Sequence, residues 1–199
     1  ISVKEFEAFY VPIPANREEA LRIVNIFKDV YESEQILKIG QNLKYDLEVL
    51  RNYDIHLAGK MWDTMIAHYL IQPELHHNMD YMAEIYLNYQ TIHIDELIGP
   101  KGKNQKSMRS LLPSQVYEYA AEDADITLRL KNKLEPELKK FECEDLFYKI
   151  EMPLMPVLAE MEMNGVCLDT ESLAETSKQF TNRMNEIEAR IYELAGERF

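Results

Sequence analysis

The chain has 199 residues and a formal net charge of −13, with 46% hydrophobic and 29% charged residues. This apolar content is sufficient for a hydrophobic core, whereas a protein this acidic does not bind nucleic acid through its bulk charge. No run of about 18 apolar residues occurs, so the sequence predicts no membrane span. A phosphate-bearing partner must be held by a local basic patch or through bound cations.

Strand and helix signals alternate over the first third of the chain. Residues 7–14 are mainly apolar and end at prolines, which is typical of a strand. Asn16 is expected to cap a helix over residues 17–31, whose apolar positions recur at helical spacing. A short apolar run at residues 36–39, closed by Gly40, predicts a buried strand.

The same alternation continues and then gives way to helices. A helix is expected over residues 44–52, a strand near 58–62 and a helix over 64–71, which together favour an α/β layer architecture. Further helices are predicted over the ranges 79–87, 113–137 and 150–163, and a final helix, capped by Asp169 or Thr170, is predicted to run to about Leu194. A domain boundary is expected near residue 147.

The segment Gly40–Asp46 lies where a predicted buried strand turns into a helix. Ligand sites in open α/β sheets gather at the carboxyl ends of strands, so Asp46 is well placed to meet a ligand. Alternatively, Asn42 caps the helix and Asp46 lies in its favourable first turn. The segment alone favours this simpler interpretation.

A second candidate segment, residues 119–125, lies inside the predicted long helix. Tyr119 and Asp123 are four residues apart and therefore share one helical face. The alanines beside them are small enough to let another element or a substrate approach closely. Alone, this segment favours the simpler interpretation of a solvated acidic face beside a packed tyrosine.

Taken together, the two segments resemble a known family. Residues 38–46 resemble the second exonuclease motif of bacterial family A DNA polymerases, and residues 119–128 resemble the third. Residues 62–65 and 101–105 resemble the intervening family segments, and residues 150–158 and 164–166 resemble the start of the polymerase region. The resemblance covers essentially the whole chain, in the order of the family.

This resemblance implies a ribonuclease H-like 3′→5′ proofreading exonuclease, in which four carboxylates hold two divalent cations, Mg²⁺ or Mn²⁺. Asp46 and Asp123 would be the metal ligands that this chain supplies, and Tyr119 would orient the attacking water. Hard cations prefer carboxylate oxygens, and two of them can stabilise the attacking and leaving oxygens of phosphodiester cleavage. The cations would also reconcile an acidic protein with a DNA substrate.

Further contacts to the single-stranded 3′ end of DNA follow from the same resemblance. Gln41, Asn42 and Tyr45 would lie against the terminal nucleotides. Lys101 and Lys103 belong to a loop rich in lysine, glycine and asparagine, a composition that suits contact with single-strand phosphates. An ordinary solvated loop is the alternative. The implied location is the bacterial cytoplasm, in association with the nucleoid.

One departure from the family puts activity in doubt. The first motif, Asp-x-Glu on the first strand, supplies two of the four carboxylates, and no such strand precedes Asp46 here. Glu5 and Glu7 have the right spacing but fall in a segment resembling the hairpin after that motif. We do not expect them to substitute, so the chain should bind divalent metal weakly or not at all and hydrolyse DNA poorly.

The chain begins with Ile1, and we expect it to be a fragment of a longer polymerase. On this interpretation residues 1–146 form an incomplete exonuclease domain, and residues 147–199 form the first helices of the polymerase, at the base of the thumb. The remaining thumb, fingers and palm would be partners, so the final helix should expose an apolar stripe. The alternative functions are a non-catalytic scaffold domain and, last, a helical interaction module.

Overall fold

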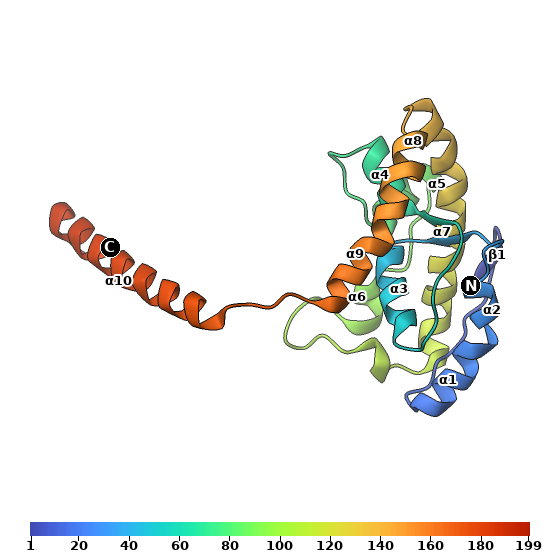
Figure 1. The fold of residues 1–199 in the computed structure, drawn as a ribbon, viewed down its shortest axis with the longest axis horizontal. Helices are drawn as coiled ribbons and strands as arrows, with labels where there is room; N and C mark the ends of the chain where they lie inside the picture. The colour runs from blue at the N-terminus through green and yellow to red at the C-terminus, as the bar shows by residue number, and fades with distance from the viewer. The chain divides into compact units, whose positions relative to one another are not determined.

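The strands and most of the helices belong to one compact part of the molecule. A computed structural model describes all residues, 1–199, and divides into a first unit, Ile1–Met163, and a second unit, Asn164–Phe199 (Figure 1). None of its helices combines the length and the apolar character that crossing a membrane requires. The mixed α/β architecture expected for the first part of the chain is present in the first unit.

The four strands form two separate pairs. Strand β1 (Ser2–Lys4) pairs antiparallel with β2 (Glu7–Ala8), and β3 (Lys38–Gly40) pairs parallel with β4 (Met61–Asp63). A parallel pair needs a crossover connection, and the chain between β3 and β4 provides it with a helix. Each strand is hydrogen-bonded to one neighbour only, so β1 and β3 each keep one open edge.

Helices make up most of the chain. In chain order they are α1 (Arg17–Ile26), α2 (Lys28–Tyr31), α3 (Leu43–Arg51), α4 (Thr64–Ile71), α5 (Met79–Leu87), α6 (Ile94–Ile98), the 3-10 turn η1 (Met108–Ser110), α7 (Pro113–Lys140), α8 (Glu144–Leu146), the π-helical turn η2 (Phe147–Glu151), α9 (Met152–Asn164) and α10 (Thr170–Ala195).

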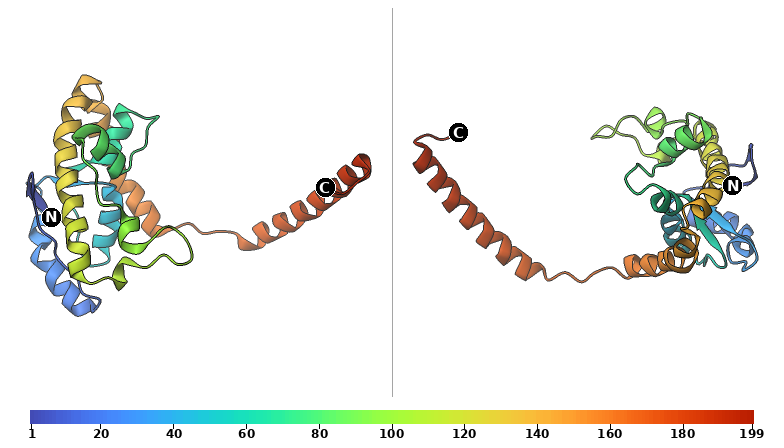
Figure 2. Two further views of the ribbon diagram at one scale, coloured as in Figure 1. Left: turned by 180° about the vertical axis from the view of Figure 1, so that it is seen from behind. Right: turned by 90° about the horizontal axis from the view of Figure 1, so that it is seen from above.

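The core of the first unit is built around α7, the long yellow helix of Figures 1 and 2. This helix packs against α4, α5 and the strands β1, β2 and β3. Its residues Leu130, Leu134 and Leu138, spaced by one helical turn, are completely buried. Trp62 of β4 is also buried and meets Phe147 with ring centroids 5.1 Å apart. One helix stripe therefore organises most of the apolar interior.

Several predicted boundaries are confirmed, and two expectations are wrong. Asn16 caps α1 by accepting a hydrogen bond from the Glu19 amide at 3.1 Å. The predicted helix over 17–31 is interrupted at Phe27, whose backbone has ψ 0°, so α1 and α2 are separate. The predicted strand over 7–14 is confined to β2: Phe9 still exchanges backbone hydrogen bonds with Ile1 at 2.8 Å, and residues 10–14 have no partner on β1.

The second unit consists of the helix α10 and its flanking segments. No residue of α10 is buried. Its apolar stripe is exposed as expected, with exposed fractions of 56% for Leu173, 67% for Phe180 and 79% for Leu194. The unit therefore has no core of its own. The two units differ in which residues pack together, and this does not test where the exonuclease part would end. The expected domain boundary near residue 147 therefore stays a prediction.

The central stripe of α7 should dominate the stability of the first unit. Replacing the completely buried Leu134 by alanine is expected to lower the free energy of unfolding by about 2–5 kcal/mol, because it removes apolar contacts and leaves a cavity. The matched control is Leu112→Ala, at a leucine that is 64% exposed, which should cost less than about 0.5 kcal/mol. Urea denaturation followed by circular dichroism measures both, and equal costs would contradict this account of the core.

Candidate active site

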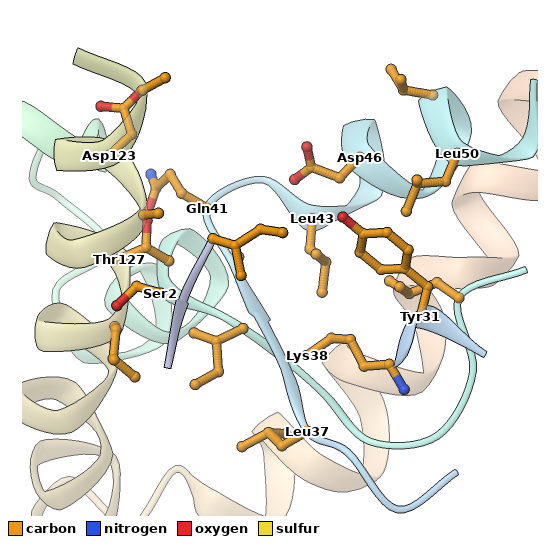
Figure 3. Close-up of a pocket in the computed structure, with 18 of the residues that line it drawn as sticks. Ser2, Tyr31, Leu37, Lys38, Gln41, Leu43, Asp46, Leu50, Asp123 and Thr127 are labelled. Carbon is orange, nitrogen blue, oxygen red and sulfur yellow. The ribbon is translucent and has the colours of Figure 1, made fainter. Parts of the chain in front are cut away.

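A cavity of about 570 Å³ opens beside β3. Its wall is formed by β1, β3 and the helices α2, α3 and α7 (Figure 3). Most of the lining is apolar, with Leu37, Ile39 and Leu43 on the β3 and α3 side and Leu128 on the α7 side. The expectation that residues 36–39 form a buried strand is wrong for Ile36 and Leu37, which precede β3 and are 43% and 39% exposed.

Two carboxylates face this cavity from different parts of the chain. Asp46 comes from the first turn of α3, and Asp123 comes from the middle of α7. Figure 3 shows the two side chains on opposite sides of the opening, and Gln41 lines the same cavity. The folding of the chain thus brings together three of the residues that the sequence singled out.

The turn between β3 and α3 places Asp46. A Cβ at Gly40 would lie 2.6 Å from the Leu43 Cδ1 atom, so any larger residue there would require the Leu43 side chain to move. Asn42 follows in the left-handed conformation, with φ 61°. Helix α3 then begins at Leu43, so that Asp46 falls in its first turn and faces the cavity. This tight turn is the reason that a residue six positions after the strand lines the same cavity as the strand.

Helix α7 presents Asp123 between two small residues. Ala120 and Ala124 both line the cavity, as expected for alanines that allow a close approach. Tyr119 lies one turn before Asp123 and is half-buried. Burial, and then the neighbouring Asp123, raise the pKa of the Tyr119 phenol to about 12. The phenol is therefore protonated near neutral pH and can donate a hydrogen bond.

Neither cavity carboxylate has a positively charged neighbour that lowers its pKa. Asp46 keeps contact with solvent, but the surrounding cavity wall partly desolvates its carboxylate and raises its pKa to about 6, and the nearby Asp63 carboxylate acts in the same direction. Loss of water contact also raises the pKa of Asp123 to about 6, with Glu122 adding to the effect, while the Tyr119 hydroxyl acts against it. Perturbed carboxylates in a cleft are typical of functional sites.

The residues present do not by themselves complete a metal centre. No three His, Cys, Asp or Glu side chains come together closely enough to hold an ion. Asp46 and Asp123 offer the hard oxygen donors that Mg²⁺ and Mn²⁺ prefer, but two carboxylates fall short of the ligand number such ions need. A two-cation site would require further ligands at this cavity.

The other predicted contact residues do not line the cavity. Asn42 is exposed and, although it precedes α3, its side chain makes no capping hydrogen bond, so the predicted cap is wrong. Tyr45 is 62% exposed on the next turn. Lys101 and Lys103 are exposed in the loop between α6 and η1. Their contacts to DNA stay predictions.

Glu5 and Glu7 point to other partners, as expected for residues that do not replace the first motif. Glu5 accepts a hydrogen bond from the Asn132 side chain at 2.7 Å. Glu7 lies 3.8 Å from the ammonium of Lys4 on the surface of the β1–β2 hairpin. Neither glutamate lines the cavity.

The sequence analysis missed two participants. Tyr31 of α2 lines the cavity, and its pKa is raised by burial and by Asp46. No motif marks it, so only the packing of α2 could reveal it. The backbone carbonyl of His77 accepts a hydrogen bond from the Gln41 side-chain amide at 2.8 Å, which ties the loop after α4 to the site. Backbone contacts of this kind leave no signal in residue types.

The unfavourable burial of the charged Asp123 carboxylate should make the free energy of unfolding depend on pH. Its pKa rises from 3.8 in the unfolded chain to about 6 in the folded protein, so the folded state binds the proton more tightly and stability falls as pH increases between these values. Asp123→Asn should therefore raise the free energy of unfolding at pH 7 by about 1 kcal/mol, discounted for partial exposure, and leave it nearly unchanged at pH 4. Urea denaturation at both pH values, with the exposed Asp29→Asn as control, measures this. Equal effects at the two pH values would contradict it.

Comparison with known proteins identifies relatives along the whole chain. A family model described as 3'-5' exonuclease matches residues 1–139. DNA polymerase I of Pseudomonas aeruginosa is 37% identical over 211 residues, which cover 100% of this chain and 23% of that protein. DNA polymerase I of Borreliella burgdorferi is 36% identical over 199 residues, covering 98% of this chain and 21% of that protein. The chain thus spans between a fifth and a quarter of the length of these relatives.

Solved structures share the fold. The polymerase domain of Pol1 from M. smegmatis, in complex with DNA primer-template and dNTP, has a TM-score of 0.70 at 20% identity, covering 89% of this chain and 28% of that one. Brucella melitensis NrnC has a TM-score of 0.57 at 21% identity, covering 69% and 63%. These similarities confirm the expected α/β, ribonuclease H-like fold. Since the family model matches residues 1–139 and the relatives align along its length, the chain belongs to the 3′-5′ exonuclease family of DNA polymerase I.

Proposed function

We propose that this chain is the 3′→5′ proofreading exonuclease part of a bacterial DNA polymerase I, which removes mispaired 3′-terminal nucleotides by hydrolysis of a phosphodiester bond. One observation carries the proposal: Asp46 and Asp123, on different helices, line one cavity and both have raised pKa values. Two uncompensated carboxylates are the arrangement expected where cations will bind. The protein would act on DNA in the bacterial cytoplasm, at the nucleoid.

Each site residue has a role that its surroundings allow. Asp46 and Asp123 would hold divalent cations, Mg²⁺ or Mn²⁺, which when bound supply charge stabilisation for the oxygens of the scissile phosphate. Tyr119 keeps its proton near neutral pH and can donate it in a hydrogen bond to the attacking water. Gln41, held by the His77 carbonyl, lines the same cavity and can contact the terminal nucleotide.

The single-stranded 3′ end would extend from the cavity over exposed residues. Asn42 and Tyr45 lie at the start of α3 with free side chains, and an exposed tyrosine is a suitable platform for base stacking. Lys101 and Lys103 provide local positive charge on an otherwise acidic protein. The exposed stripe of α10 is consistent with a partner in the remaining parts of the polymerase.

The further carboxylates that a two-cation site needs could come from a strand beside β1 and β3. Strands β1 and β3 are each three residues long, each keeps one edge without hydrogen bonds, and both line the cavity. We infer that a further strand carrying Asp-x-Glu lies between them in the active enzyme. Its apolar residues would cover the apolar wall at Leu37 and Ile39, and its acidic residues would join Asp46 and Asp123.

The chain by itself should hydrolyse a single-stranded oligonucleotide with Mn²⁺ slowly or not at all, because two carboxylates do not satisfy two cations. A version extended before Ile1 by a designed strand with alternating apolar residues and Asp-x-Glu should remove nucleotides from the 3′ end. Electrophoresis of a 5′-labelled oligonucleotide measures both.

Site variants of the extended version separate hydrolysis at this cavity from a contaminating nuclease. Asp46→Asn and Asp123→Asn should each lower the rate by at least about 100-fold, since even residues behind metal ligands affect activity by 10- to 100-fold. The exposed Asp29→Asn should leave it unchanged. Rapid turnover by the unextended chain would refute the requirement for further carboxylates, and an inactive extended version would favour the non-catalytic scaffold.

A further inference from the structure

Asp63 is a buried carboxylate that joins the starts of two helices. Its side chain is 1% exposed. One oxygen, Oδ1, accepts hydrogen bonds from the amides of Met65 at 2.8 Å and Ile66 at 3.1 Å, in the first turn of α4. The other, Oδ2, accepts one from the Leu43 amide at 2.6 Å, at the start of α3. The first amides of a helix have no partner within the helix, so Asp63 satisfies donors of both.

The adjacent residue adds contacts to the same turn. The Thr64 hydroxyl lies 3.2 Å from the Gly40 carbonyl and also within reach of the Gln41 side-chain oxygen. Because a hydroxyl has one proton, it donates to one of these acceptors at a time. The residues that join β4 to α4 therefore contact the turn Gly40–Leu43, which joins β3 to α3. The parallel pairing of Gly40 with Asp63 holds these two strand-to-helix connections side by side.

These contacts replace a local cap that is absent. Asn42 stands in the capping position of α3 but is left-handed and makes no side-chain capping bond. A charged acceptor at two helix starts is favoured by charge-assisted hydrogen bonds and by both helix dipoles. Asp63 does not line the cavity, whereas Asp46, three residues after Leu43, does. Asp63 therefore acts on the site in two ways: its charge raises the pKa of Asp46, and its hydrogen bond to Leu43 fixes the start of α3.

We propose that Asp63 is a positioning residue of the site: by accepting the Leu43 amide it fixes the first turn of α3, and with it the direction in which Asp46 faces the cavity. The alternative is that Asp63 merely caps α4. The positioning role deepens the proposed exonuclease function and rests on it, whereas the bridge between the two helices is a property of the chain itself.

Asp63→Ser separates the two roles. Serine is nearly as good an N-cap as aspartate, so the amides of Met65 and Ile66 should keep their protection against hydrogen exchange within about threefold. Its single oxygen cannot also reach α3, so the Leu43 amide should exchange about 10- to 100-fold faster, as expected for a lost hydrogen bond to a charged group. The measurement is amide exchange by NMR in the 199-residue chain.

Two further variants make the result decisive. Asp63→Asn keeps the shape of the side chain if the serine variant does not fold; its one oxygen should stay with the two α4 donors, leaving its amide group against Leu43, so the Leu43 amide again loses protection. Asp169→Ser is the matched control, since Asp169 caps only α10 through the Ser172 amide at 2.9 Å. It should leave the Leu43 amide unchanged.

The positioning role is read from Asp46 itself. The carboxyl carbon resonance of Asp46, measured well above its pKa of about 6 so that loss of the Asp63 charge cannot change its protonation, should shift in Asp63→Ser and stay in place in Asp169→Ser. Unchanged Leu43 exchange, or an unchanged Asp46 resonance despite faster Leu43 exchange, would overturn the proposal. In the extended version, Asp63→Ser should slow single-turnover hydrolysis about 10- to 100-fold while oligonucleotide affinity stays within about twofold. If the extended version with Asp63 intact is inactive, the proposed function fails, and exchange and resonance still decide the role of Asp63.

Discussion

The packing of α7 is the constraint on which the rest of the first unit depends. Its C-terminal half buries Leu130, Leu134 and Leu138 against the helices around it. Its middle carries Asp123 beside the open edges of β1 and β3. Because one rigid helix serves both purposes, the position of the carboxylate is set by apolar contacts several turns away. A site built on a regular helix is held more precisely than one built on a loop.

Two features of the cavity are energetically unfavourable in the chain by itself. Its apolar wall, including Leu37 and Ile39, stays in contact with solvent, and its two carboxylates lack compensating positive charge. Both costs disappear if an extended segment covers the wall and cations neutralise the acids. Structure that is unfavourable by itself and favourable with partners is typical of a binding site.

The second unit shows the same dependence on partners in a simpler form. An amphipathic helix in water gains most of its stability from packing its apolar face, and α10 packs its stripe against nothing within its own unit. Gly165, with φ 71°, ends the preceding helix in the left-handed conformation that glycine adopts easily. The capped start at Asp169 keeps α10 helical, but its apolar residues contribute little until they are covered.

The sequence by itself predicted most of the longer helices, the α/β class of the fold and the candidate site residues, but it missed the short helix α6 and the break between α1 and α2. Periodicity and caps are local, so Asn16, the helix over 64–71 and the two acidic motifs could be recognised from residues close in the chain. Only the tertiary structure decided that Asp46 and Asp123 face one cavity, that Leu37 is exposed, and that Asp63 rather than Asn42 satisfies the start of α3. Each of these depends on strand pairing and helix packing between segments far apart in sequence, where contacts between distant residues override local preference.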